Sequence, residues 1–259
     1  MPAEGRVIAV GLMMSVVALS AQQREPDSPD ASASFEVASV KPNKNGAPNA
    51  IPPLLPNGGY GASNVALKSV IANAYQVRIF QIEGGPDWLA FDRFDILARG
   101  REGTPDALRP AMLRTLLAER FKLVAHFETR EQQVYSLVLL RSDGRLGPQL
   151  KPSAADTKPG LPLTSVGNGI GRIAGTGVLI DAFAGVLAND FRQMVINRTD
   201  LKGRFDIDLR FTPETSRAAV PEFPSIFTAM QEQLGLKLEP ARAPVRVLVI
   251  DSVQQPTPD

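Results

Sequence analysis

The chain has 259 residues, and its 28 Lys and Arg residues against 27 Asp and Glu residues leave a formal net charge of +1. Proteins that bind nucleic acid usually carry a clustered basic surplus, so this balance argues against that class. The sequence contains no Cys and a single His. These two counts exclude disulfides, thiolate metal sites, cysteine nucleophiles and any site that needs two imidazoles from one chain.

The first 21 residues have the layout of a secretory signal peptide. Arg6 precedes an apolar run at Val7–Leu19, and the small residues Ser20 and Ala21 follow it. The run is shorter than the roughly 20 residues that a membrane-spanning helix needs. We therefore expect an exported protein, periplasmic or secreted, that keeps no stable membrane span once residues 1–21 are removed.

Polar segments border the expected folded region at both ends. Residues 22–34 contain Ser, Asp and Pro without hydrophobic periodicity, and they predict a flexible tether. Residues 254–259 have the same character and predict a disordered tail. The folded part of the chain is thus expected between Phe35 and Val253.

The central part of the chain contains an internal repeat. Arg93-Phe94-Asp95-Ile96 recurs as Arg204-Phe205-Asp206-Ile207, a separation of 204 − 93 = 111 residues. Four identical residues alone would be weak evidence for a repeat. The predicted elements around the two copies also follow the same order, which strengthens it. We therefore predict two related units, at residues 35–141 and 178–253, joined by a connection rich in Gly and Pro at 142–177.

Each unit is predicted to consist of a helix, a strand, a second helix and two further strands. Apolar residues recur at helical spacing in the helices and alternate with charged residues in the strands. The expected elements of the first unit are an added strand at Phe35–Lys41, a helix with Leu67, Val70, Ile71, Ala74 and Tyr75 inward, a strand at Arg93–Ala98, a helix at Pro110–Phe121, and strands at Leu123–Thr129 and Gln133–Leu140 with Arg130 in the hairpin between them.

The second unit repeats this order. Its expected elements are a helix with Leu179, Phe183, Val186, Leu187 and Phe191 inward, a strand at Arg204–Phe211, a helix at Ser225–Leu234, and strands at Leu236–Glu239 and Val245–Asp251. Ser225 is the expected N-cap of its helix and Gly235 the C-terminal stop. The connection contains a candidate short strand at Gly171–Ala174. Strands joined by short turns beside helices indicate an α+β fold, with helices packed on largely antiparallel sheets.

His126 is the only candidate for a histidine general base. A catalytic triad also needs a nucleophile, and the sequence contains no G-x-S-x-G element. On its predicted strand, His126 points away from the face that carries Ala125 and Phe127. A strand His that pairs with a neighbouring carboxylate or bonds the backbone is the favoured interpretation, and we assign no catalytic residue.

Two Asp residues occupy the same position in the two copies of the Arg-Phe-Asp-Ile repeat. Equivalence favours a structural role for Asp95 and Asp206, since a catalytic residue is rarely needed twice. Asp206 and Asp208 share one strand face, but no calcium-binding loop surrounds them. A solvated face shared with Arg204 and Arg210 explains them better, and we predict no metal site and no cofactor.

Trp88 is the only Trp, and it follows a tight turn at Gly84-Gly85-Pro86. An anchor that plugs the end of the core is favoured over a platform for a ligand. The residues retained as candidate ligand contacts are His126, Trp88, Arg130, Asp95 and Asp206.

Six segments together resemble a large family of soil-associated bacterial exported proteins of unknown function. They are Phe35–Pro42, Gly84–Leu89, Asp92–Ile96, Leu116–Leu123, His126 with Glu128–Glu131, and Gln231–Glu239. The family also occurs as an extracytoplasmic domain joined to membrane metallopeptidase-type sensors. One departure is Asp200, which stands where the family pattern D-R-T-G-L has Gly. The resemblance implies export and a shared fold, and it transfers no activity and no site.

These features favour a non-enzymatic binding or sensing module of the cell envelope. Duplication, export and the missing catalytic motifs motivate this hypothesis, and the partner would be an envelope protein or a small ligand. One alternative is a hydrolase that acts on envelope or extracellular polymers with His126. Another is a structural scaffold that self-associates through strand edges.

Overall fold

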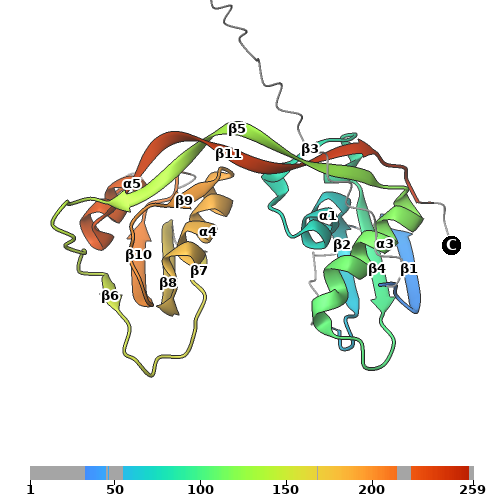
Figure 1. The fold of residues 1–259 in the computed structure, drawn as a ribbon, viewed down its shortest axis with the longest axis horizontal. Coiled ribbons are helices and arrows are strands. Elements are labelled where there is room, and N and C mark those ends of the chain that lie inside the picture. The colour runs from blue at the N-terminus through green and yellow to red at the C-terminus, as the bar shows by residue number, and fades with distance from the viewer. Residues whose placement is uncertain (1–32, 45, 47–54, 168, 215–222, 257–259) are drawn as a thin grey trace, which may run out of the picture.

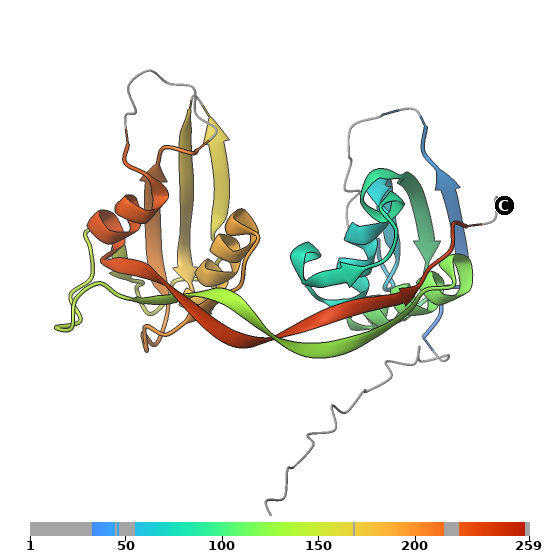
Figure 2. The same cartoon turned by 90° about the horizontal axis from the view of Figure 1, so that it is seen from above.

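The computed structural model describes residues 33–44, 46, 55–167, 169–214 and 223–256. The predicted signal peptide and all but the last two residues of the predicted tether lie outside these ranges. The chain forms two α+β lobes joined by one long ribbon of two strands, to which the short strands β3 (Ile82–Gly84) and β9 (Val195–Asn197) add at the outer edges (Figure 1). In the view from above, both lobes stand on the same side of the ribbon (Figure 2).

The ribbon consists of β5 (Val124–Leu139) and β11 (Leu236–Ser252), which pair antiparallel along their whole lengths. The predicted hairpin around Arg130 is therefore wrong: Arg130 lies inside β5 and pairs with Val245. Residues 130–132 contain no Gly, Pro or Asn to form a tight turn. The partner strand β11 also supplies hydrogen bonds to their backbone, so the chain stays extended.

Lobe 1 has a three-stranded antiparallel sheet in the order β1-β4-β2. Its elements are β1 (Val37–Pro42), β2 (Tyr60–Ala66), α1 (Leu67–Tyr75), η1 (Ile79–Gln81), β3 (Ile82–Gly84), α2 (Trp88–Phe91), β4 (Arg93–Arg99), η2 (Asp106–Leu108) and α3 (Arg109–Phe121). The central strand β4 alternates as predicted: Phe94, Ile96 and Ala98 are buried against the helices. The short strand β3 pairs parallel with the C-terminal half of β11.

Lobe 2 has a four-stranded sheet in the order β6-β10-β8-β7. Its elements are β6 (Leu150–Pro152), β7 (Leu163–Gly167), β8 (Ile170–Val178), α4 (Ile180–Phe191), β9 (Val195–Asn197), β10 (Phe205–Phe211), α5 (Ile226–Ala229) and the π-helical turn η3 (Met230–Leu234). The segment 142–177, predicted as a connection, thus contributes strands to this sheet, and β8 includes the short strand expected at Gly171–Ala174.

Helix termini follow the expected chemistry. The Ser225 side chain accepts a hydrogen bond from the Thr228 amide, and Gly235 ends η3 with a φ of 68°. Leu179, predicted to face inward, is instead the N-cap of α4 and is 44% exposed. The chain also stays bonded past its predicted end, because the Gln254 amide donates to Phe121 O and the Gln255 side chain to Asp92 Oδ2.

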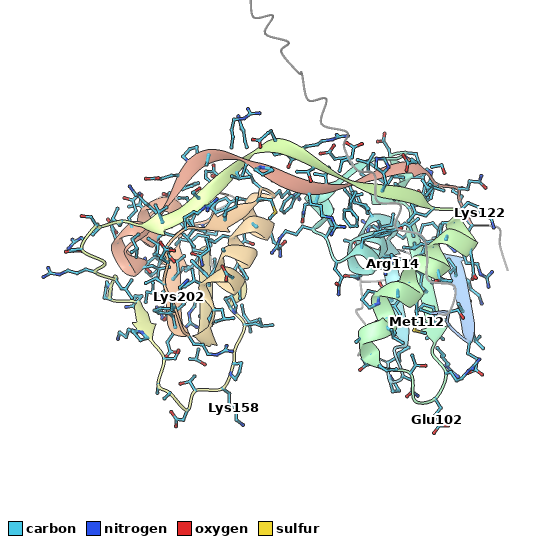
Figure 3. All side chains as sticks on the ribbon, in the orientation of Figure 1. Glu102, Met112, Arg114, Lys122, Lys158 and Lys202 are labelled. Carbon is cyan, nitrogen blue, oxygen red and sulfur yellow. The ribbon has the colours of Figure 1, made fainter. Side chains whose placement is uncertain are left out.

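Each lobe has its own hydrophobic core between sheet and helices. A smaller cluster along the middle of the ribbon contains Val134, Ala243, Val245 and Val247. Phe80 belongs to η1, an element of lobe 1, but its side chain packs against the core of lobe 2. Figure 3 labels Glu102 and Lys158 on the loops furthest from the ribbon, one in each lobe. The α+β class is confirmed, whereas a duplication of units stays a prediction.

Candidate functional site

A cavity of about 930 Å³ lies among elements of lobe 1 and reaches lobe 2 at one residue. Strand β2, helix α1, the residues after α1 and the start of α3 line it, and Asn189 of α4 is the contribution of lobe 2. The volume falls within the range that small-molecule sites occupy. Its apolar lining includes Leu55, Ala62, Val65, Ala72, Val77, Ile79, Pro110 and Leu113. Its polar and charged lining includes Tyr60, Ser69, Asn73, Gln76, Arg78, Asp106, Arg109 and Asn189.

The backbone position of Arg78 is determined by the end of α1 and by the ribbon. Helix α1 stops at Gln76, whose left-handed φ of 53° turns the chain toward lobe 2. The Arg78 amide donates to Gln81 Oε1 at 3.0 Å, and Gln81 Nε2 donates to Arg246 O of β11 at 2.8 Å. The start of η1 is thus tied to the ribbon, and Arg78 is held beside the cavity.

The Arg78 side chain bridges the lobes. Its Nη1 donates to Asn189 Oδ1 at 2.5 Å. Gly185 makes room for the guanidinium, because a Cβ there would lie 2.9 Å from Arg78 Nη2. No carboxylate in the described part of the chain forms an ion pair with Arg78, and burial lowers the pKa of its guanidinium. A cation without a paired anion therefore stands at the wall of the cavity.

A second Arg at the cavity is already neutralised. Arg109 Nη2 lies 2.8 Å from Asp106 Oδ1, and Arg109 Nε donates to Gly59 O at 2.8 Å. Asp106 Oδ1 also accepts the Gly58 amide at 2.9 Å. These contacts hold the turn before β2, so Asp106 and Arg109 add structure and leave Arg78 as the unbalanced charge.

Tyr60 adds a hydroxyl to the same cavity. Asn73 Nδ2 donates to its oxygen at 3.5 Å, and burial raises the pKa of Tyr60. The hydroxyl therefore keeps its proton near neutral pH and can donate a hydrogen bond to a ligand. Together with Arg78, it makes the polar groups of the cavity better donors to an anion than acceptors from a cation.

Two of the candidate ligand contacts from the sequence lie on the ribbon. His126, 8% exposed, places Nδ1 2.8 Å from Asp251 Oδ2 and Nε2 2.9 Å from Glu128 Oε1. Arg130 then bonds both Glu128 and Glu83. The His–carboxylate pairing expected from the sequence is thus confirmed, and bonds from His126 and then Arg130 hold the pKa of Glu128 below its usual range. Neither His126 nor Arg130 lines the cavity.

The two equivalent Asp residues each hold an irregular turn of a neighbouring strand. Asp95 Oδ1 accepts Asn43 Nδ2 at 2.9 Å, Ser63 Oγ at 2.7 Å and the Asn64 amide at 2.9 Å. Asn64 has a φ of 55° where β2 shifts register before α1. These bonds lower the pKa of Asp95, that of Asn43 most.

Asp206 makes the matching contacts in lobe 2. Its Oδ1 accepts Ser153 Oγ at 2.5 Å and the amide of Gly177, whose φ is 63°, at 3.0 Å. The Ser153 bond is the main cause of its lowered pKa. On the same sheet face, Arg172 lies 2.7 Å and Arg210 3.5 Å from Asp208, which fits the expected solvated face. The described residues contain no group of acids and His able to hold a metal ion.

Trp88 is half-buried on α2 and packs edge-on against Phe94 with ring centroids 6.4 Å apart. It belongs to the core of lobe 1, as the anchor interpretation expected. Asp95 and Asp206 lie in separate sheets, and His126 and Arg130 in the ribbon. The structure brings only His126 and Arg130 together, so the five candidates do not form one cleft, and their ligand roles stay predictions.

Sequence reasoning missed Arg78, because a lone Arg after an amphipathic helix carries no motif. It also missed a second repeat signal. Lys41-Pro42-Asn43 and Lys151-Pro152-Ser153 lie 151 − 41 = 110 residues apart. Lys41 pairs with Asp95, and Lys151 with Asp206, so each Lys-Pro dipeptide ends the strand beside its Asp. That signal could have been found by extending the search for repeats upstream.

Comparisons with known proteins supply a family and no activity. The sequence matches the family described as "Protein of unknown function (DUF3738)" over residues 68–253. Comparison with curated proteins and with solved structures gave no match. Among the helices that the structure describes, none has the length and apolar character to cross a membrane. Because the match covers well over half of the chain, the protein belongs to the DUF3738 family of proteins of unknown function.

Proposed function

We propose that this protein is an exported, non-enzymatic binding module and that the cavity of lobe 1 is its ligand site. The observation that carries the proposal is the guanidinium of Arg78, which stands without a paired carboxylate at the wall of a cavity of about 930 Å³. Because Arg78 is half-buried, it would attract an anion in the cavity more strongly than a fully exposed Arg would. A sensing role, export, a soil-associated origin and joining to membrane sensors rest on the sequence resemblance and on the signal-like residues 1–21.

The hydrolase alternative finds less support. His126 has each ring nitrogen beside a carboxylate oxygen, so neither nitrogen is placed to activate a nucleophile. It also lies on the ribbon, outside the set of residues that line the cavity.

Blocking the cavity tests the proposal. N-phenyl-1-naphthylamine, a neutral apolar dye that fluoresces when it leaves water, serves as the probe. Ser69 lines the cavity from α1, so Ser69→Trp is expected to abolish the fluorescence gain. Lys68→Trp is the matched control, because Lys68 is the neighbouring half-buried residue of the same helix and does not line the cavity. Equal fluorescence in both variants, with unchanged circular dichroism, would contradict a binding site here.

A further inference from the structure

The two lobes differ at the sheet edge that faces the other lobe. In lobe 2, β8 pairs with β10 on one side and with β7 on the other. In lobe 1, β2 takes the place of β8: it lies beside the central strand and runs into the first helix of its lobe. Within the described ranges β2 pairs with β4 alone. In Figure 1, β2 and β7 are the labelled strands of these two sheets that lie nearer to the other lobe.

The cavity lies along this edge of β2. Tyr60, Gly61 and Ala62 line it, and they pair with Ala98, Leu97 and Ile96 of β4 on their other side. An extended strand in the cavity would therefore lie beside β2 in the same way that β7 lies beside β8. Backbone N–H and C=O groups along such an edge are ready-made partners for an added strand.

The chemistry at the end of the first helix differs between the lobes. In lobe 2, Thr164 of β7 pairs with Ile173, and its hydroxyl lies 3.5 Å from Asp190 Oδ2 near the end of α4. In lobe 1, Arg78 follows the end of α1 and lines the cavity. A strand added to β2 would thus share the cavity with a cation, whereas β7 lies beside a carboxylate.

We propose that the cavity receives an extended peptide segment that pairs antiparallel with β2 and places an acidic side chain against Arg78. This inference rests on the proposed function and names the class of ligand. Strand pairing supplies affinity through the backbone, and the ion pair with Arg78 selects an acidic residue at one position. The sequence of β7 indicates which strand fits such an edge, and its Thr164 position is the one that should become acidic.

Synthetic peptides with the sequence of residues 160–167 test the proposal against the full chain. One carries Thr164→Glu and the other Thr164→Lys, each with a fluorescent label, and binding is followed by fluorescence anisotropy. We expect the Glu peptide to bind about tenfold more tightly than the Lys peptide, as one charge-assisted contact provides. Arg78→Gln should bring this ratio close to one, whereas Arg101→Gln, at an exposed position of the same lobe outside the cavity, should leave it unchanged.

Two further measurements locate the peptide. Methylation of alternate backbone nitrogens in the Glu peptide should remove its binding, because those N–H groups pair with β2. Hydrogen exchange should slow at residues 60–62 when the Glu peptide is bound. Equal binding of the two peptides, an unchanged ratio in Arg78→Gln, protection at β7 instead, or no binding of either peptide would overturn the inference. Dye binding that Ser69→Trp abolishes would, in that case, still support the cavity as a ligand site.

Discussion

In lobe 1 the central strand β4 carries Asp95, and in lobe 2 the central strand β10 carries Asp206. Each carboxylate accepts a backbone amide at a position of positive φ and a hydroxyl from a nearby Ser. The inner edges differ, since β7 covers β8 while Arg78 and a cavity lie beside β2. The lobes thus share a carboxylate on the central strand that holds an irregular turn of a neighbouring strand. The candidate for function is found where they depart from each other.

The ribbon joins the two lobes into one unit, and a core substitution measures how strongly. Leu137 of β5 is fully buried in the core of lobe 2. Leu137→Ala should lower the free energy of unfolding by about 2–5 kcal/mol, the usual loss for a buried Leu. Trp88, the only Trp, reports on lobe 1. We expect its fluorescence in urea to show the same lowered midpoint as circular dichroism.

Leu248→Ala is the matching change, because Leu248 of β11 is fully buried in the core of lobe 1. If Leu137→Ala left the Trp88 transition unmoved while Leu248→Ala shifted it, the lobes would unfold independently. The comparison would then be between two domains and not between two halves of one cooperative unit.

Removal of the shared carboxylates should cost less, and the cost should differ between the lobes. Asp95 accepts three hydrogen bonds, and Asp206 accepts two. Both Asp95→Asn and Asp206→Asn should lower Tm by a few degrees, with the larger loss for Asp95→Asn. Differential scanning calorimetry of the two variants checks the order. Asp87→Asn is the control, because Asp87 is exposed and its side chain caps no helix. A reversed order would show that the lobes depend differently on these residues.

Acid should weaken both lobes through these groups. The folded state lowers the pKa of Asp95, Asp206 and Asp208. A carboxyl with a lowered pKa contributes stability that is present above its unfolded pKa of about 4 and is lost as pH falls through its folded pKa. The urea midpoint should therefore fall as the pH drops below about 4, and less steeply in Asp95→Asn. A midpoint that rises on acidification would contradict this.

The smallest effect is expected at the contact between the lobes. Gly185→Ala places a Cβ near Arg78 Nη2, which is the mobile end of a long side chain and can shift. Ala in a helix interior gains about 0.5–1 kcal/mol over Gly. We expect a slightly raised Tm, together with weaker binding of the Glu peptide because Arg78 is displaced. A lowered Tm would mean that the Arg78–Asn189 contact stabilises the pair of lobes more than the helix gains.

Local patterns were enough to predict most helices and strands. The inward residues of α1, the alternation in β4 and β10, and the caps at Ser225 and Gly235 all agree with the structure, because spacing and capping depend on neighbours in sequence. The α+β class followed from the same patterns. The continuation of β5 and β11 from one lobe into the other did not follow from them. Arg130 was expected in a hairpin and lies instead in a strand, paired with Val245.

The sequence by itself determined the composition of the protein, the absence of cysteine chemistry, the amphipathic pattern of its main helices and strands, and the recurrence of Arg-Phe-Asp-Ile around Asp95 and Asp206. Only the tertiary structure decided that β5 and β11 run unbroken through both lobes, and that Arg78 meets Asn189, 111 positions away in the chain, beside a cavity. The physical reason is that strand pairing and the space left between packed elements depend on residues distant in sequence, for which local periodicity carries no signal.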